Sequence, residues 1–317
     1  MTKVFITGIS GFAGSHLADY LLSLGNYEIS GTYLDEPSLA NISNREKLDL
    51  HKINLLDALA TEDLIVSQKP DLLFHLAALT SPRSSFDNPT ETFVNNISAQ
   101  ITILEALKKH KMFDTKVLVI SSAEVYGLVS FQDLPIDEKT PFNPTNPYAV
   151  SKLAQDYLGL EYFLSQKLKI VRVRPFNHVG PRQTPIFVVS AFAKRIVEIE
   201  KGKEKVMRVG NLSSKRDFTG VQDMVRAYVL AIEKGELGDV YNLGSGSSYQ
   251  ISEILEMMKK LSTAKIETLE DPDLMLPTDN PDFVCDYSKF NKLTGWKPEI
   301  PIEKTLAETL EYWRKVI

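Results

Sequence analysis

The sequence predicts an α/β protein with a doubly wound parallel sheet and a smaller mixed α/β lobe toward its C-terminus. Three observations support this fold class. Short β-branched runs alternate with helical patterns through the first half of the chain, as expected of strands joined by crossover helices. These runs are continuously apolar, as expected of strands in a parallel sheet that helices cover on both faces. After residue 174 the alternation gives way to a stretch interrupted by proline and glycine.

The first half predicts the elements of the sheet in turn. Each apolar run is short enough for a strand, and each helical pattern repeats its apolar residues every three or four positions. We expect strands at 3–7, 27–34, 71–78 and 116–122. We expect helices over 13–24 and 97–107, and a further helix that begins at Pro147.

The second half predicts a separate lobe and a return to the sheet. We expect helices over 187–200, 251–261 and 302–313, and a strand at 239–245. Residues 1–174, completed by about 219–248, are assigned to the sheet domain. Residues 175–218 and 249–317 are assigned to the second lobe.

The bulk composition excludes several classes of protein. The chain has 317 residues and a formal net charge of -5, so it lacks the basic field of a nucleic-acid binder. Its longest apolar runs fall short of the roughly 20 residues that span a bilayer. With a single cysteine, Cys285, and no visible secretion signal, we expect a cytoplasmic protein that binds neither nucleic acid nor membrane. The five histidines show no ligand spacing, so we expect no metal site.

A glycine-rich turn predicts a dinucleotide site of the Rossmann type. Gly8, Gly11 and Gly14 follow the first strand and open the first helix. Such glycines allow a tight turn, close approach of the backbone to a pyrophosphate and close packing of the helix on the strand. Asp35 lies after the second strand, where a carboxylate accepts from ribose hydroxyls. No arginine or lysine occupies 29–44, which mildly favours NAD(H) over NADP(H).

Two further motifs predict redox chemistry at the mouth of the sheet. The stretch SSAEVYG closes a strand with Ser122 and Glu124, and YAVSK opens a helix with Tyr148 and Lys152. The last two are four residues apart and share a helical face. A nearby ammonium and an oxidised nicotinamide lower the pKa of the phenol, so Tyr148 can act as general acid or base on a carbinol oxygen. Lys152 can also bond the nicotinamide ribose, and Ser122 can share the substrate oxygen.

With these motifs the chain resembles the extended short-chain dehydrogenase/reductase family. The stretches RPFNHVGPRQ at 174–183 and VGNLSSKRDFTGVQDMVRAY at 209–228 resemble its nucleotide-sugar branch, most closely the GDP-6-deoxy-4-keto-mannose reductases and GDP-mannose 4,6-dehydratases. The resemblance implies a GDP-sugar substrate, and a homodimer formed by helices near 91–110 and 147–165. It assigns Asn177, Val188, Lys194 and Arg216 to the substrate site. It adds Phe12, Ala13, Leu55, Leu76, Ala77 and Ala78 to the cofactor site.

Two departures from the family pattern stand out. Leu276 precedes Pro277 where relatives often have an arginine, which removes one expected phosphate contact; Arg182 is a hypothetical substitute. Asn54 and Leu55 stand where an aspartate often meets the adenine amino group, with Asp57 a weaker stand-in.

The motifs favour one reaction and leave others open. A 4-keto reductase needs only hydride delivery and a proton from Tyr148, and the stretch RPFNHVGP resembles that subgroup. A 4,6-dehydratase needs a further acid and base, of which only Glu124 is present in the Ser122-Ala123-Glu124 run. A UDP- or dTDP-sugar 4-epimerase or dehydratase is a further alternative. A noncatalytic dinucleotide sensor is disfavoured, because Tyr148 and Lys152 are both retained.

Overall fold

A seven-stranded sheet forms the centre of the computed structural model, which describes residues 1–275 and 282–317. Its strands lie in the order β3-β2-β1-β4-β5-β6-β10, and every neighbouring pair is parallel. They are β1 (Thr2–Thr7), β2 (Tyr27–Tyr33), β3 (Asp49–Lys52), β4 (Leu72–His75), β5 (Lys116–Ile120), β6 (Lys169–Pro175) and β10 (Val240–Leu243). The order reverses between β1 and β4, which is where doubly wound sheets bind ligands. This confirms the predicted fold class.

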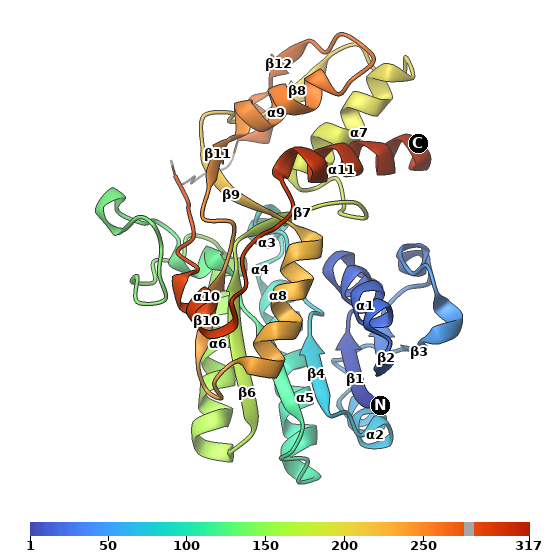
Figure 1. Cartoon of the computed structure of the whole chain (residues 1–317), viewed down its shortest axis with the longest axis vertical. Helices are drawn as coiled ribbons and strands as arrows, with labels where there is room; N and C mark the ends of the chain where they lie inside the picture. The colour runs from blue at the N-terminus through green and yellow to red at the C-terminus, as the bar shows by residue number, and fades with distance from the viewer. Residues whose placement is uncertain (276–281) are drawn as a thin grey trace.

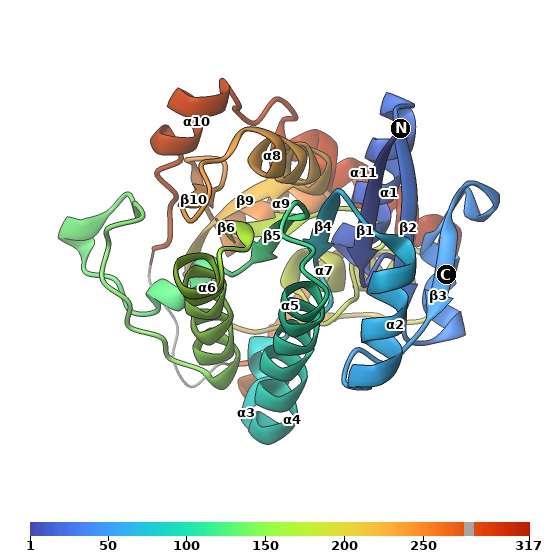
Figure 2. The ribbon, with the colours of Figure 1, turned by 90° about the horizontal axis from the view of Figure 1, so that it is seen from below.

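Helices cover both faces of this sheet, which explains its continuously apolar strands. Figure 2 shows α1, α8 and α10 on one face and α2, α5 and α6 on the other. Their bounds are α1 (Phe12–Leu24), α2 (Ala58–Gln68), α5 (Ala99–Lys109), α6 (Pro147–Gln166), α8 (Val221–Lys234) and α10 (Ser288–Thr294). All four residues of β4 are buried between these two layers. The last residue of that strand, His75, is polar although it is buried, which indicates that it has a role other than packing.

A second lobe lies above the carboxyl ends of the strands (Figure 1). It has a three-stranded sheet in the order β11-β9-β7 and a parallel pair, β12 with β8. Its strands are β7 (Asn177–Val179), β8 (Met207–Val209), β9 (Lys215–Gly220), β11 (Ser248–Gln250) and β12 (Thr268–Glu270). Its helices are α7 (Val188–Glu200), α9 (Ile251–Lys260) and α11 (Ile302–Val316). Phe192, Ile196, Leu255, Leu306 and Trp313 form part of its separate core.

The chain enters the lobe after β6 and returns to the sheet through α8 and β10. Helix α8 packs against α1 although more than 190 residues separate them in sequence, and β10 adds an edge strand beside β6. This return falls within the predicted segment 219–248. The lobe is therefore built from two stretches of chain, one between β6 and β10 and one after β10, and the cleft between the two parts receives residues from both.

Short helical turns fill the connections around the cleft. They are η1 (Glu36–Asn41), η2 (Arg45–Lys47), α3 (Pro82–Asp87), α4 (Pro89–Phe93), the π-helical turn η3 (Val94–Ser98), η4 (Ala123–Tyr126), η5 (Phe131–Asp133) and η6 (Pro272–Leu274). Across residues 1–275 and 282–317, no helix is both long and apolar enough to cross a membrane.

Candidate active site

A cleft of about 420 Å³ opens at the carboxyl ends of β1, β4, β5 and β6. This volume is within the range of small-molecule sites, which run from roughly 300 to 1,000 Å³. The sheet contributes the glycine turn, the end of β5 and the start of α6, while the lobe contributes β7 and the start of α7. Of the predicted site residues, the cleft is lined by Gly8, Gly11, Phe12, Ala13, Gly14, Leu76, Ala78, Ser122, Glu124, Tyr148, Lys152, Asn177 and Val188.

The glycine turn has the backbone geometry that a dinucleotide pyrophosphate requires. Gly8 adopts a left-handed conformation with φ of 67°, and a Cβ at Gly14 would overlap the carbonyl oxygen of Gly8. Helix α1 begins at Phe12, and no side chain of a described residue caps its first turn. The backbone amides of this first turn therefore face the cleft as hydrogen-bond donors for an anion. The positive end of the helix dipole strengthens this attraction. The residues present fit a nicotinamide dinucleotide.

The floor of the cleft is organised by Thr7, the last residue of β1. Its Oγ1 accepts from the amides of Leu76 and Ala77, each at 3.1 Å. Ala77 lies directly against Gly8, where an added Cβ would come within 3.0 Å of its Cα. Close contact between the two turns after β1 and β4 thus explains why a glycine is needed at this position.

Ser122 and Tyr148 come together at the centre of the cleft. Ser122 ends the β5 segment and caps η4 by accepting from the amide of Glu124 at 3.1 Å. Both side chains line the cleft and are almost fully buried, and the Ser122 hydroxyl acts on the Tyr148 phenol. Burial raises the pKa of Tyr148 well above its usual value, the Ser122 hydroxyl lowers it, and the charge of Glu124 raises it. The phenol is consequently protonated at neutral pH.

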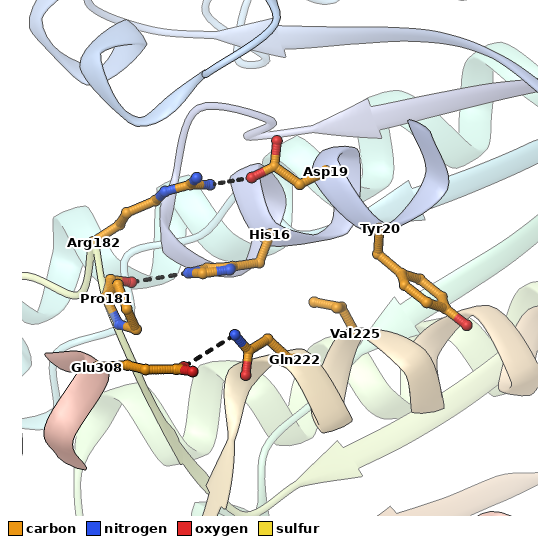
Figure 3. A pocket seen from close by; sticks show the side chains of 8 residues that line it. All are labelled: His16, Asp19, Tyr20, Pro181, Arg182, Gln222, Val225 and Glu308. Carbon is orange, nitrogen blue, oxygen red and sulfur yellow. Dashed lines mark hydrogen bonds and ion pairs between the residues drawn. The ribbon is translucent and has the colours of Figure 1, made fainter. Parts of the chain in front are cut away.

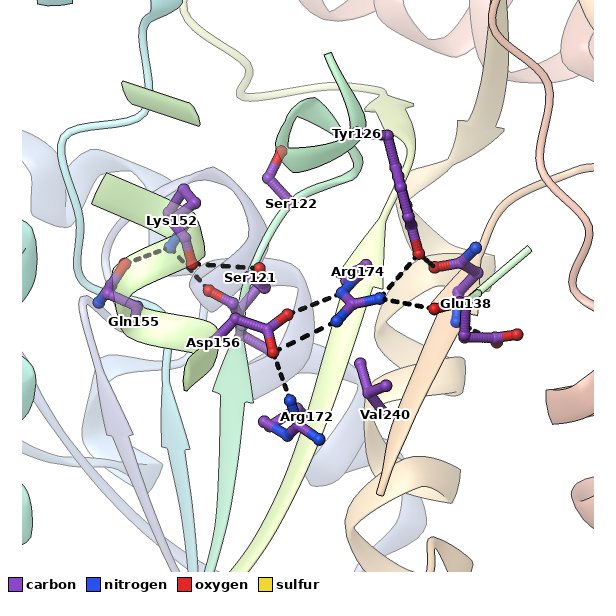
Figure 4. A network of polar contacts seen from close by, with 12 residues as sticks. Ser121, Ser122, Tyr126, Glu138, Lys152, Gln155, Asp156, Arg172, Arg174 and Val240 are labelled. Carbon is purple, nitrogen blue, oxygen red and sulfur yellow. Dashed lines mark hydrogen bonds and ion pairs between the residues drawn. The ribbon is translucent and has the colours of Figure 1, made fainter. Parts of the chain in front are cut away.

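Lys152 lies one helical turn after Tyr148 and is almost fully buried. Its ammonium donates to the Ile120 carbonyl at 2.7 Å. It also donates to Oε1 of Gln155 at 2.8 Å, as Figure 4 shows. Burial lowers the pKa of Lys152 to about 7, against the raising effect of Asp156. The expectation that an ammonium lowers the pKa of Tyr148 is wrong for the chain alone, because desolvation of the phenol dominates.

Glu124 faces the same cleft and is held by the start of α6. Its Oε2 accepts from Nδ2 of Asn146 at 3.2 Å, while Oδ1 of Asn146 accepts from the amide of Ala149 at 2.8 Å and caps the helix. One capping residue thus fixes both the carboxylate and the helical turn that carries Tyr148.

The predicted substrate residues divide into two groups. Asn177 and Val188 line the cleft at its lobe side. Lys194 lies two turns along α7, with its ammonium 3.5 Å from Oε1 of Glu198. Arg216 lies on β9, and its Nη1 donates to the Lys215 carbonyl at 2.7 Å. Among the described residues, neither of these two cations belongs to the cleft lining. Leu276 lies outside the described residues.

At the adenosine side, two predicted residues serve the fold. Asp35 caps η1 by accepting from the amide of Ser38 at 2.9 Å, and its side chain remains exposed. Leu55 packs into the core with Phe5 and Ile65. Within the described residues, neither of the two lines the cleft.

Pairing of β2 with β3 brings a cation to the adenosine side that local sequence did not reveal. Tyr33 at the end of β2 aligns with Lys52 of β3. The Lys52 ammonium lies 3.4 Å from Oε1 of Glu36, next to Asp35. The absence of cations from 29–44 is therefore a poor guide to cofactor choice. Asp57, the expected stand-in for adenine recognition, caps α2 by accepting from the amide of Ala60 at 3.1 Å.

Arg182 does not replace the missing phosphate contact. Its guanidinium pairs with Asp19 of α1 at 2.7 Å and donates to Oγ of Ser43 at 3.1 Å. Figure 3 shows it beside His16 in a second pocket, which is lined by residues of α1, α8 and α11. The left-handed backbone of Arg182, with φ of 70°, belongs to the turn that carries the side chain there. The hypothesis of a substrate phosphate contact is wrong for this conformation.

His178 and Tyr228 are among the lining residues that the sequence did not assign to the site. His178 stacks on Phe12 with ring centroids 5.6 Å apart and an interplanar angle of 9°. Tyr228 of α8 also lines the cleft, and its buried hydroxyl has no hydrogen-bond partner among the described residues. Its position at the end of the stretch 209–228 was visible in the sequence, but its orientation depends on the packing of α8 under β5 and β6.

Comparisons with known proteins agree with this geometry. A family model described as GDP-mannose 4,6 dehydratase matches residues 5–309. GDP-6-deoxy-D-mannose reductase of Pseudomonas aeruginosa is 34% identical over 312 residues, which cover 98% of this chain and 97% of that protein. GDP-mannose 4,6-dehydratase of Yersinia enterocolitica is 28% identical over 352 residues, covering 97% of this chain and 92% of that protein.

Solved structures resemble the chain along its whole length. The structure of RMD from Pseudomonas aeruginosa complexed with NADPH has a TM-score of 0.87 at 33% identity and covers 100% of both chains. UDP-glucose 4-epimerase from Thermotoga maritima with UDP-glucose has a TM-score of 0.90 at 26% identity and covers 99% of each. The two parts of the cleft, sheet and lobe, are therefore common to relatives with different substrates.

Proposed function

The chain belongs to the GDP-mannose 4,6-dehydratase family and is an NAD(P)-dependent nucleotide-sugar enzyme of the extended short-chain dehydrogenase/reductase class, and on that premise we propose that it reduces the 4-keto group of a GDP-4-keto-6-deoxy-hexose. The observation that carries this proposal is the buried, protonated Tyr148 that lines the cleft together with Ser122. A ketone reduction requires one proton donor at the carbonyl oxygen, and Tyr148 is that donor.

The roles of the chain's residues follow from their positions. A reduced nicotinamide, when bound, supplies the hydride that C4 receives. Ser122 and Tyr148 bind the O4 atom, and Tyr148 gives its proton to that oxygen, so the ketone becomes an alcohol. The charged Lys152 stabilises the phenolate that forms. Gly8, Gly11 and Gly14 with the first turn of α1 hold the pyrophosphate of the cofactor.

The substrate side supports a sugar nucleotide in the same cleft. Asn177 presents an amide that can orient a hexose hydroxyl or phosphate oxygen, and Val188 begins a helix whose N-terminus faces the cleft. The GDP moiety is proposed from the Pseudomonas aeruginosa and Yersinia enterocolitica relatives, both of which are named for GDP-sugars. Arg216 and Lys194 remain proposed contacts for its outer parts, beyond the described cleft lining.

The direct test is an assay of the purified chain with GDP-4-keto-6-deoxy-mannose and NADH or NADPH. We expect oxidation of the reduced cofactor in step with formation of a GDP-6-deoxy-hexose, identified by NMR of the product. Tyr148→Phe removes only the proton donor, so kcat is expected to fall by at least about 10²-fold while the affinity for cofactor is retained. Tyr312→Phe, a half-buried tyrosine of α11, is the matched control. Full activity of Tyr148→Phe would contradict the assignment.

A second candidate is the 4,6-dehydration of GDP-mannose, which Glu124 favours. Its carboxylate lies in the cleft near Tyr148 and is oriented by Asn146, as a base for the C5 proton would need to be. The two functions differ in their consumption of cofactor. If GDP-mannose and an oxidised cofactor yield a 4-keto product without net cofactor change, the dehydratase replaces the reductase.

We also propose a homodimer built on α5 and α6. Val150, Tyr157 and Leu164 follow one another at seven-residue spacing along α6 and are 39%, 51% and 58% exposed. Val94 of η3 and Ile101 of α5 are also exposed and also lie seven residues apart. A stripe at this spacing is typical of a helix that packs against another helix. The occupant proposed here is the same stripe of a second copy, giving a four-helix bundle.

A further inference from the structure

A chain of buried side chains connects the catalytic lysine to the floor of the cofactor cleft. Gln155 is fully buried on α6, where its Oε1 accepts from the Lys152 ammonium at 2.8 Å. Its Nε2 lies 3.3 Å from Nε2 of His75 at the end of β4. Nδ1 of His75 lies 2.9 Å from Oγ1 of Thr7, the hydroxyl that holds the amides of Leu76 and Ala77.

The ammonium determines the direction of each hydrogen bond in this chain, because it can only donate. Gln155 must turn its oxygen toward Lys152, so its NH2 group faces His75. Nε2 of His75 then accepts, which puts the ring proton on Nδ1, on the side of Oγ1 of Thr7. The neutral ring that this needs is the form that burial favours, since desolvation, helped by the charge of Lys152, lowers the pKa of His75 to about 3.

The charged groups near Lys152 leave the side-chain contact with its ammonium to the amide of Gln155. Asp156, on the same helix, is the carboxylate that acts on Lys152, yet it is held between two guanidiniums, with Nε of Arg174 2.7 Å from its Oδ2. On the other elements, the groups that face Lys152 or its neighbour Tyr148 are His75 of β4, Glu124 of η4 and Tyr228 of α8. Among the described residues, the ammonium donates to the Ile120 carbonyl and to Gln155. Only the second of these is a side chain.

We infer that Gln155 is a positioning residue for the proposed reduction, which holds the Lys152 ammonium charged and in place through a hydrogen bond anchored at its far end by His75 and Thr7. The inference rests on the proposed function, because the charge of Lys152 matters only where Tyr148 gives up a proton. Gln155 itself touches neither substrate nor cofactor in this arrangement. Its contribution is to the protonation state and placement of its neighbour.

The test compares Gln155→Met, Gln155→Glu and the control Gln100→Met. Methionine keeps the volume but removes the acceptor, so the alkaline limb of the kcat/KM profile moves to lower pH by about one unit. Glutamate places a carboxylate against the ammonium, so the limb moves to higher pH. Gln100 is also buried, but among the described residues its Nε2 donates to the backbone carbonyl of Gln155, at 2.8 Å, and not to the Lys152 site. Its variant therefore leaves the limb where it is in the wild type.

A second readout needs no substrate. The side-chain NMR signal of Lys152 in lysine-labelled protein, assigned by its loss in Lys152→Met, is titrated in the wild type and the two Gln155 variants. Its midpoint should move down in Gln155→Met and up in Gln155→Glu. A wild-type chain without reductase activity refutes the proposed reaction but leaves this titration interpretable. Midpoints that coincide within about 0.2 units in all three proteins would overturn the inference.

Discussion

At the scale of single residues, Lys152 gives the reaction a defined pH dependence. Burial lowers its pKa to about 7, so the ammonium is present below that pH and is lost above it. Because the proposed reaction uses the charged form, kcat/KM should be highest on the acidic side and fall as pH rises through about 7. A pH profile measured with subsaturating substrate checks this. A profile that rises through the same region would show that the neutral amine is the active form.

Tyr228 allows a stability test that depends on a single oxygen atom. Its hydroxyl is buried without a partner among the described residues, and an unsatisfied buried group costs about 1–3 kcal/mol. Tyr228→Phe should therefore leave the free energy of unfolding unchanged or raise it by about 1 kcal/mol, as measured by urea denaturation of the cofactor-free chain.

Tyr126→Phe is the matched control for that measurement. The Tyr126 hydroxyl donates to Oδ1 of Asn242 at 2.7 Å and accepts from Arg174 at 2.9 Å. Its removal leaves both partners short of a hydrogen bond, so the free energy of unfolding should fall by about 1–3 kcal/mol. A similar fall in Tyr228→Phe would mean that the Tyr228 hydroxyl has a partner in solution.

At the scale of elements, α6 and β6 are joined by a buried charge network. The Asp156 carboxylate lies between the guanidiniums of Arg172 and Arg174, and all three side chains are nearly inaccessible to solvent (Figure 4). Asp156→Asn leaves two buried cations without their counter-charge, which should lower the free energy of unfolding by about 3–5 kcal/mol. Chemical denaturation followed by circular dichroism measures this.

An exposed ion pair between neighbouring elements provides the comparison. Asp114 is fully exposed and lies 2.7 Å from the ammonium of Lys169. Asp114→Asn should leave the free energy of unfolding almost unchanged, because solvent screens an exposed ion pair. Equal losses in the two variants would indicate that the buried network is hydrated and adds no more than a surface pair.

How far the sequence could predict the site depended on the elements involved. Gly8, Ser122 and Tyr148 follow strands or begin helices, and in a parallel sheet those ends meet at one edge, so local pattern predicted that they line one cleft. Lys52 required the register of β3 against β2, which no local pattern contains. Gln155 and Tyr228 lie on helix faces that looked like ordinary core. Their polar atoms gain meaning only from neighbours on other elements.

At the scale of the whole molecule, the proposed dimer predicts the effect of one charge on the stripe of α6. Leu164→Glu places a carboxylate within the proposed apolar helix contact, so the protein should sediment as a monomer where the wild type sediments as a dimer. Leu59→Glu on α2, where Leu59 is 74% exposed, should leave the assembly intact. Analytical ultracentrifugation measures both variants. A monomeric wild type at micromolar concentration would contradict the dimer.

The two lobes contribute to one cleft through contacts that also join them. His178 from the lobe stacks on Phe12 from the glycine turn, and His16 of α1 contacts the Pro181 carbonyl at 2.9 Å. The sequence indicated two closely packed lobes. The contact between the rings of His178 and Phe12 shows that they meet at the phosphate-binding turn. Any movement between the lobes would alter the cofactor site and the substrate site together.

The position of β7, α7, β8 and β9 between β6 and β10 also has a consequence for biosynthesis. A ribosome releases β1 through β6 first, so six strands can pair while the lobe is still being translated. Helix α8 and β10 emerge only after more than forty further residues, and until then the β6 edge and the surface of α1 that α8 covers remain open. The nascent chain therefore passes through a stage with an exposed sheet edge, and such an edge is a surface to which a chaperone binds.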